Sequence, residues 1–324
     1  MTALTQPIAL SRDSGAARTA PSKGADRLFQ GAAYASALLV LLVLAGILGS
    51  IIYGARSAFA EFGFGFLTSS SWNIATEQFG ALPAVIGTVA AAFLALIIGV
   101  PISLGIAVYL TQLCPGWARK PVAMTIELLA SVPSIIYGMW GLFVFAPLFA
   151  RFVQVPVSNL VEGLPIVGTI LYARIPSGVG VLTAGIILAI MIVPFVASIT
   201  RDMLDQIPTV LRESAYGIGC TTWEVVRHVL VPQASISIIG AIMLGLGRAL
   251  GETMAVTFVI GNANRLSASI FDPGSTIASR IANEFNEADG LQLSSLMALG
   301  CLLFIITFFV LIIARLLVRR AKVA

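Results

Sequence analysis

Charged side chains are scarce in this sequence. Asp, Glu, Lys and Arg together make up only 10% of the 324 residues, whereas 58% are hydrophobic. Soluble globular proteins carry about 25% charged residues. A composition this apolar excludes an ordinary soluble domain.

Residues that commonly bind metals or perform catalysis are equally few. The chain has one histidine, His228, and three scattered cysteines, Cys114, Cys220 and Cys301. Neither a C-x-x-C pair nor a Cys/His cluster is present, so the sequence indicates no metal site and no disulfide framework. It also lacks the G-x-x-x-x-G-K-[ST] loop that binds ATP phosphates. We therefore expect no catalytic residues, no metal, no cofactor and no enzyme activity in the chain itself.

What the sequence does contain is long apolar runs. A helix needs about 20 apolar residues to cross a hydrocarbon core roughly 30 Å thick. Six runs reach this length, at about residues 30–54, 84–110, 122–149, 178–200, 235–261 and 293–317. They are continuous rather than alternating, which predicts helices and not transmembrane strands. The predicted fold class is all-α: a polytopic membrane protein with six transmembrane helices in contact with lipid.

The distribution of Lys and Arg predicts the orientation of these spans. Six spans place both termini on one side, and most of the 19 Lys and Arg residues fall on that side. The positive-inside rule assigns this side to the cytoplasm. The sequence thus predicts a multi-pass protein of the cytoplasmic membrane with both termini in the cytoplasm. Since the net charge of +4 reflects this bias, it gives no indication of nucleic-acid binding.

Composition divides the chain into four parts. Residues 1–27 are polar and are predicted to be a disordered cytoplasmic tail, and residues 318–324 a basic cytoplasmic tail. Residues 28–81 hold the first span and an extracytoplasmic segment, whose Phe and Trp side chains suit the membrane–water interface. Residues 82–317 form the main transmembrane domain.

A polar block at 201–232 interrupts this apolar domain. Pro208 stands where a helix can begin, Gly219 can turn the chain, and Thr221 with Glu224 forms a capping-box pattern for a second helix. Pro232 is expected to stop that helix before the fifth span. The helical pattern alone fits two interpretations equally: a hairpin that docks on another protein, and a solvated hairpin on the membrane surface.

Three ionisable residues fall inside predicted spans, where charge is costly and is a functional candidate by default. Arg248 and Glu252 are four residues apart in the fifth span, so they are expected to stack one helical turn apart. An Arg guanidinium recognises oxyanions with two parallel hydrogen bonds. The alternative is an ion pair that serves only packing. Glu127, in the third span, is a weaker candidate for the same pathway because it lies close to the cytoplasmic Lys120.

The block at 201–232 resembles the cytoplasmic coupling loop of ABC importer permeases. Glu213, Ser214, Ala215 and Gly219, followed by Val229-Leu230-Val231-Pro232, fit the pattern E-A-A-x3-G-x9-I-x-L-P with conservative departures. Further runs resemble the PstC-type permease family of phosphate importers, over about residues 55–317. These runs are FGFGFLTSSSWN, ALPAVIGT, ELLASVPSIIYGMWGLFVF and GRALGETMAVTFVIGN.

This resemblance implies a fold, a set of partners and a function. The fold is that of a type I ABC importer permease, and the function is ATP-driven phosphate import by alternating access. The implied partners are a PstA-like second permease, two ATPase subunits and an extracytoplasmic phosphate-binding protein. Glu213, Ser214, Ala215, Gly219 and Pro232 would couple to the ATPase.

The resemblance also implies that Arg248 and Glu252 serve phosphate passage. Guanidinium chemistry alone leaves other oxyanions open, so a sulfate or molybdate importer is an alternative. A further alternative is a secondary transporter that works without an ATPase.

Overall fold

The computed structural model describes residues 23–164 and 167–321. The predicted disordered tail up to residue 22, and residues 322–324 of the predicted basic tail, lie outside the described residues. The chain divides into two compact units, Met1–Ser50 and Ile51–Ala324. Helix α1 (Lys23–Phe62) crosses the boundary between them.

Most of the remaining elements are helices, in keeping with the all-α prediction. In chain order they are α2 (Gly65–Thr68), α3 (Leu82–Val108), α4 (Gly116–Ala130), α5 (Ser134–Trp140), α6 (Ala146–Phe149), α7 (Val155–Val161), α8 (Val167–Leu171), α9 (Val181–Asp205), α10 (Thr209–Gly217), α11 (Thr222–Val225), α12 (Val231–Gly251), α13 (Met254–Val259), α14 (Ile277–Glu284) and α15 (Gly290–Ala321). Four π-helical turns join some of them: η1 (Tyr109–Leu113), η2 (Gly141–Phe145), η3 (Ala150–Gln154) and η4 (Val226–Leu230). Strands β1 (Trp72–Asn73) and β2 (Gln78–Phe79) pair antiparallel.

In the part of the chain that the structure describes, six helical stretches are long and apolar enough to cross a membrane, which agrees with the predicted number of spans. They are Asp26–Phe62, Leu82–Leu113, Ser134–Val161, Val181–Asp205, Thr222–Gly251 and Gly290–Leu316. The outermost helices run further than the apolar runs that predicted them. Residues 23–27 belong to α1 and residues 318–321 to α15, because a helix can continue beyond its membrane-spanning part.

The third span lies further along the chain than the sequence predicted. A span at about 122–149 was expected, but α4 ends at Ala130 and the span starts at Ser134. The break falls at Pro133, whose nitrogen carries no hydrogen for the helical ladder. Residues before proline are also driven out of the helical conformation.

The fifth span begins earlier than predicted, at Thr222 rather than about residue 235. The prediction that Pro232 stops the preceding helix is wrong. Pro232 lies in the first turn of α12, and η4 joins α12 directly to α11. Within this π-helical turn the Val231 N–H bonds the carbonyl of Val226, five residues back. The wider turn accommodates a proline ring that would clash with a regular α-helix.

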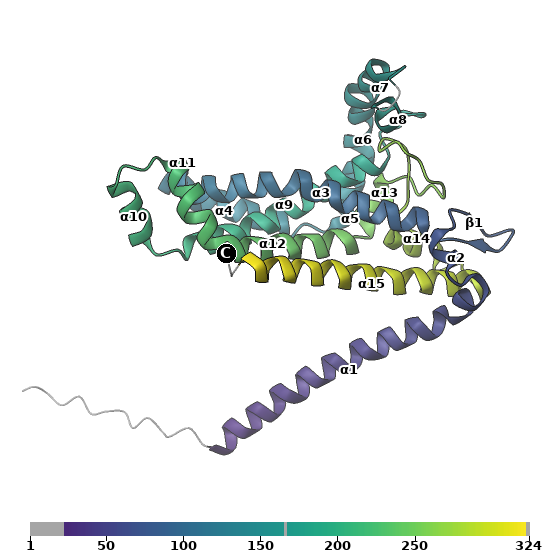
Figure 1. Cartoon of the computed structure of the whole chain (residues 1–324), viewed down its shortest axis with the longest axis horizontal. Coiled ribbons are helices and arrows are strands. Elements are labelled where there is room, and N and C mark those ends of the chain that lie inside the picture. The colour runs from purple at the N-terminus through teal and green to yellow at the C-terminus, as the bar shows by residue number, and fades with distance from the viewer. Residues whose placement is uncertain (1–22, 165–166, 322–324) are drawn as a thin grey trace, which may run out of the picture. The chain divides into compact units, whose positions relative to one another are not determined.

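Small residues bring the helices of the second unit close together. Helix α9 lies alongside α3 and α12, with α15 nearby (Figure 1). A Cβ atom added to Gly185 would lie 2.7 Å from Leu94 Cβ, so only glycine permits this approach of α9 to α3. Ala91, Ala95 and Ala184 are buried in the same core. Small side chains at such contacts are typical of helix packing in membranes.

The two ends of this bundle differ in structure. One end carries the hairpin of α10 and α11 and is called the hairpin end below (Figure 1). The opposite end carries β1, β2 and α14. There Phe66, Trp72 and Phe79 are buried in a core with Ile277 and Leu299. The aromatic residues predicted to lie at a membrane interface thus include several that fold inward, because the strand pair turns them toward α14 and α15.

Candidate functional site

The polar block forms a helical hairpin, as the sequence predicted. Helix α10 follows Pro208, and the chain turns at Gly219, whose φ of +91° is a conformation that favours glycine. Thr221 caps α11 in a complete capping box: its hydroxyl accepts from the Glu224 N–H, and the Glu224 carboxylate accepts from the Thr221 N–H at 2.7 Å. The local pattern of turn and cap residues therefore determines the shape of the hairpin.

The residues that match the coupling-loop pattern do not share one environment. Glu213, Ser214, Gly219 and Pro232 are exposed, and a side chain at Gly219 would stand in open space. Ala215 instead is buried. It packs in a core at the hairpin end that joins the hairpin to α3, α9 and α12. The members of that core are Ala107, Leu204, Ile207, Ala215, Val225, Val226, Leu230, Ala234 and Ile238.

Large apolar side chains lie exposed on the hairpin. Ile218 is 83% exposed beside the turn, and Trp223 is 67% exposed at the start of α11. Val210 and Leu211 are exposed on α10. The hairpin thus has a buried side that fixes it to the bundle and an apolar exposed side.

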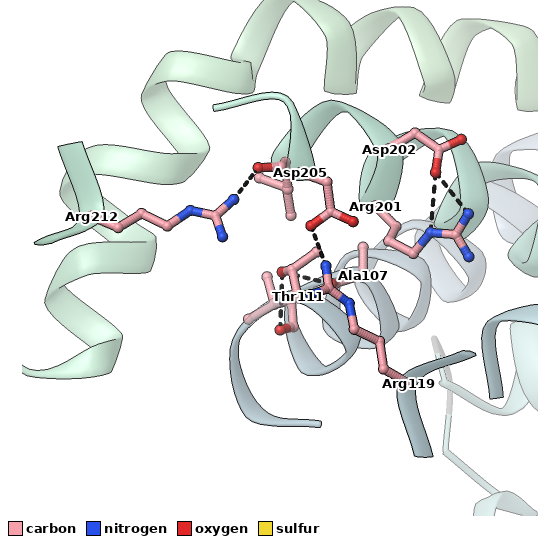
Figure 2. A network of polar contacts seen from close by, with 9 residues as sticks. Ala107, Thr111, Arg119, Arg201, Asp202, Asp205 and Arg212 are labelled. Carbon is pink, nitrogen blue, oxygen red and sulfur yellow. Dashed lines mark hydrogen bonds and ion pairs between the residues drawn. The ribbon is translucent and has the colours of Figure 1, made fainter. Parts of the chain in front are cut away.

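A network of charged residues surrounds the same end of the bundle. Arg119 Nη2 lies 2.5 Å from Asp205 Oδ1, and Arg212 donates to the carbonyl of Leu204. Figure 2 shows Arg119 directed at Asp205, and Arg201 directed at Asp202, which lies 2.7 Å away. These contacts fasten α4 and α10 to the last turns of α9.

Glu127 belongs to this network rather than to the middle of a span. Its Oε1 lies 2.8 Å from Arg201 Nη2, so it links α4 to α9. Both residues line a depression of about 490 Å³ together with Arg119, Lys120, Ala123, Met124, Asp202 and Asp205. Glu127 and Arg248 form no hydrogen bond or ion pair with each other among the described residues.

Arg248 lies in the last turn of α12 and has very different surroundings. Its Nε atom is buried without a hydrogen-bond partner, and no ion pair to Arg248 occurs in residues 23–164 and 167–321. Its guanidinium carbon lies 5.9 Å from the centre of the Phe195 ring on α9. Arg248 is therefore a half-buried cation near one aromatic ring, and no carboxylate of the described residues neutralises it.

The prediction that Glu252 stacks one helical turn from Arg248 is wrong. Helix α12 ends at Gly251, and Glu252 has an extended backbone with ψ of 127°. Its Oε1 accepts a hydrogen bond from the Ala255 N–H at 3.2 Å and so supports the start of α13. The glycine at 251 and the carboxylate at 252 break the helix where the sequence had suggested one continuous span.

The break at Pro133, just before the third span, and the break at Glu252, just after the fifth, belong to neighbouring segments. Helix α5, which follows Pro133, packs on α13, which follows Glu252. A Cβ atom added to Gly138 would lie 2.9 Å from Ala255 Cα, so glycine is required for this contact. In secondary transporters, discontinuous helices commonly line the substrate site. The proline in Ser-Val-Pro at residues 131–133 was the signal from which the first break could have been found.

A second buried arginine, at the opposite end, was not singled out from the sequence. Arg280 is only 3% exposed; it stacks 4.5 Å from the Trp72 ring centre and donates to Ser275 Oγ at 2.8 Å. Glu284 Oε1 lies 3.6 Å from it, and Trp72 Nε1 donates to the same carboxylate at 2.9 Å. Burial lowers the pKa of Arg280, and the charge of Glu284 offsets part of that effect. This arginine is neutralised within the chain, so it fixes β1 to α14.

Comparisons of sequence identify relatives over nearly the whole chain. The family model described as "Binding-protein-dependent transport system inner membrane component" matches residues 99–323. The phosphate transport system permease protein PstC of Mesorhizobium japonicum is 53% identical over 96% of this chain and 94% of its own length. PstC of Pasteurella multocida is 53% identical over 88% and 89%, and PstC 1 of Mycobacterium tuberculosis is 34% identical over 88% and 90%.

Comparisons of structure agree on the fold. A bacterial alginate ABC transporter chain matches with a TM-score of 0.62 at 16% identity, covering 91% of this chain and 96% of that one. The methionine ABC transporter MetNI, in an inward-facing conformation, matches with a TM-score of 0.54 at 21% identity, covering 74% and 94%. The predicted type I ABC importer permease fold is thereby confirmed. With the PstC sequences, these matches show that the chain belongs to the binding-protein-dependent inner membrane component family, in its PstC-type group of phosphate transport permeases.

Proposed function

We propose that this chain forms the pathway by which inorganic phosphate crosses the cytoplasmic membrane in an ATP-driven importer. The observation that supports it best is the free guanidinium of Arg248. A cation at membrane depth is costly unless it is paired or faces a water-filled cavity. An arginine that lacks a carboxylate partner among the described residues is suited to bind an anion that arrives from outside. Phosphate fits its planar, bidentate donors.

Glu252 has a different part in this proposal. Its carboxylate supports α13 and so keeps the fifth span broken next to Arg248. The break exposes backbone groups to the pathway instead of burying them in a continuous helix. We therefore place Glu252 in the pathway as the residue that shapes it.

As a member of this family the chain is a transport component of an ABC transporter complex, not a catalytic one. We propose that the other subunits are a PstA-like second permease, two ATPases and an extracytoplasmic phosphate-binding protein. The exposed apolar side chains of Ile218 and Trp223 suit a groove on the ATPase. The absence of an ATP-binding loop from the sequence agrees with this division of work.

The hairpin end faces the cytoplasm in this proposal, and both termini lie on the same side. Arg119, Lys120, Arg201, Arg212 and Arg227 all occur in the segments at that end. Such an accumulation of basic residues marks the cytoplasmic side of membrane proteins.

In this proposal, a movement of the hairpin is transmitted to Arg248 along the helix of the fifth span. The buried core around Ala215 makes the hairpin move with α3, α9 and α12. From Thr222 the helix continues through η4 to Gly251, so its far end carries Arg248. ATP-driven closure of the ATPases would thus change access to the arginine, which is the requirement for alternating access.

Uptake of labelled phosphate into proteoliposomes that contain the reconstituted complex tests this function. We expect Arg248→Ala to lower uptake at least about 100-fold, which corresponds to about 2.7 kcal/mol. The complex should still assemble, as judged by co-purification of its subunits. Arg151→Ala is the matched control, because Arg151 is an exposed arginine in the third span. Uptake by Arg248→Ala equal to that of Arg151→Ala would refute the role of Arg248 in the pathway.

A further inference from the structure

The break at Pro133, between α4 and the third span, leaves a backbone carbonyl without its regular partner. The carbonyl of Leu129 lies in the last turn of α4, and its α-helical donor would be the N–H of residue 133. That residue is Pro133, which has no N–H. The Val132 N–H lies 3.3 Å from the carbonyl oxygen, at the long end of hydrogen-bond distances.

The hydroxyl of Tyr137 supplies the missing donor. It donates to the Leu129 carbonyl oxygen at 2.8 Å, across the break from α5 to α4. A tyrosine hydroxyl has a single proton to donate, and its oxygen can also accept. With that proton held by Leu129, the Tyr137 oxygen is restricted to accepting hydrogen bonds from any further partner.

This acceptor belongs to a segment that packs near the end of α12, where Arg248 lies. Tyr137 is half-buried and packs against the core that contains Ala249 and Leu250, the residues next to Arg248. The next residue, Gly138, packs on Ala255, just past the end of α12 that carries Arg248, and the buried Arg248 Nε has no partner among the described residues. The two broken spans therefore present together a group that only donates, the guanidinium, and a group that only accepts, the phenol oxygen.

We propose that Tyr137 is a specificity-determining residue that selects an oxyanion carrying its own proton. This inference rests on the proposed function, in which Arg248 contacts the cargo. Phosphate at neutral pH retains at least one proton, which can bond the Tyr137 oxygen while its other oxygens bind Arg248. Sulfate and molybdate are fully deprotonated at that pH and would place lone pairs against lone pairs. A site built around a specific hydrogen bond strongly rejects an analogue that cannot make it.

Equilibrium dialysis of labelled phosphate against the purified complex, without its binding protein, tests the proposal. Omitting that protein leaves only the selectivity of the permease. In the wild-type complex, arsenate, which is also protonated, should displace phosphate, and sulfate should do so at least about 100-fold less well. In Tyr137→Phe we expect phosphate to bind about 10-fold more weakly and sulfate to compete within a few-fold of phosphate.

A second variant alters the hydrogen bond between Tyr137 and the Leu129 carbonyl without changing Tyr137 itself. Pro133→Ala provides an N–H for the Leu129 carbonyl and so releases the Tyr137 proton. Tyr137 could then donate to a deprotonated anion, and sulfate binding should improve while phosphate binding stays within a few-fold. Tyr109→Phe is the matched control, because Tyr109 is an exposed tyrosine of the second span. It should leave the ratio of phosphate to sulfate affinity unchanged.

The ratio of the two affinities decides the outcome. If Tyr137 serves only packing, Tyr137→Phe lowers binding of both anions equally, and an unchanged ratio overturns the proposal. Should Tyr137→Phe fail to assemble, an unchanged ratio in Pro133→Ala overturns it equally. A wild-type complex that binds no phosphate also overturns it, whereas uptake with the complete importer decides the proposed function separately. Wild-type binding by Arg248→Ala would refute the cargo contact itself.

Discussion

Two arginines at the hairpin end are paired with carboxylates, whereas Arg248 in the fifth span is not. Arg119 and Arg201 lie at the end of the bundle, where water and lipid headgroups can solvate them, yet each lies within 2.8 Å of a carboxylate. Arg248 lies inside a span, where an isolated charge is least tolerated, and no carboxylate of the described chain pairs with it.

If ion pairs served only to stabilise the fold, the arginine inside the span would have a carboxylate partner, and the arginines near the surface could remain unpaired. A pair near the surface contributes only about 0–1 kcal/mol, whereas an unpaired buried charge is strongly destabilising. The ion pairs at the hairpin end hold α4 against α9, and we expect substitutions in them to have small effects. By this reasoning the unpaired charge of Arg248 is unfavourable for the fold, and in the proposed function the cargo supplies the missing anion.

The largest expected effect comes from giving Arg248 a partner of its own. Phe195 faces the guanidinium at 5.9 Å, so Phe195→Glu would place a carboxylate where the ring now lies. A tethered carboxylate competes with free phosphate at a high effective concentration. Phosphate uptake in proteoliposomes should fall about 100-fold or more, while Phe195→Leu should keep most of it. Normal uptake by the Glu variant would show that the guanidinium is not the contact for the cargo.

An intermediate effect is expected from the turn of the hairpin. Gly219→Asp introduces a charged side chain at a φ of +91°, where non-glycine residues are strained by about 1–2 kcal/mol. The new side chain would also project into the space that we assign to the ATPase. ATP hydrolysis should continue, while phosphate transported per ATP hydrolysed falls about 10-fold.

Gly116→Asp is the control for that measurement. Gly116 also has open space around it, but it is the first residue of α4 and has no positive φ. It should couple normally. Equal coupling in both variants would contradict docking at Gly219.

The smallest effect is expected for the ion pair between α4 and α9. In Glu127→Gln the guanidinium of Arg201 keeps Asp202 at 2.7 Å, so the loss in unfolding free energy should stay below about 1 kcal/mol. Thermal melting of the complex measures this loss, and uptake should stay within about twofold of wild type. A 10-fold loss of uptake without a change in melting temperature would instead support the pathway role that the sequence predicted for Glu127.

The number and type of the spans could be predicted from the sequence, because continuous apolar runs have one stable solution in a membrane. The hairpin could be predicted for a similar reason: Pro208, Gly219 and the Thr221–Glu224 capping box each act through local backbone chemistry. The position of the third span was missed. Apolar composition continues across Pro133, and hydropathy does not register a missing N–H.

The sequence identified one residue of the candidate site but not how that residue relates to its neighbours. Arg248 was identifiable as an ionisable residue in an apolar run. Its relation to Glu252 was misjudged, because spacing of four residues places side chains one turn apart only if the helix continues. Tyr137 gave no signal, since a tyrosine in an apolar helix is unremarkable until its neighbours are known.

The sequence by itself determined that this chain is a six-span helical membrane protein with a polar hairpin and a costly arginine in its fifth span. These properties depend on composition and on contacts within a few residues. Tertiary structure decided which charges are neutralised: it paired Arg119 with Asp205 and Arg201 with Glu127, and left Arg248 free. It also packed α5, which carries Tyr137, on α13, which follows the break after Arg248. Pairing between distant segments depends on how the helices pack, and neither spacing nor hydropathy contains that information.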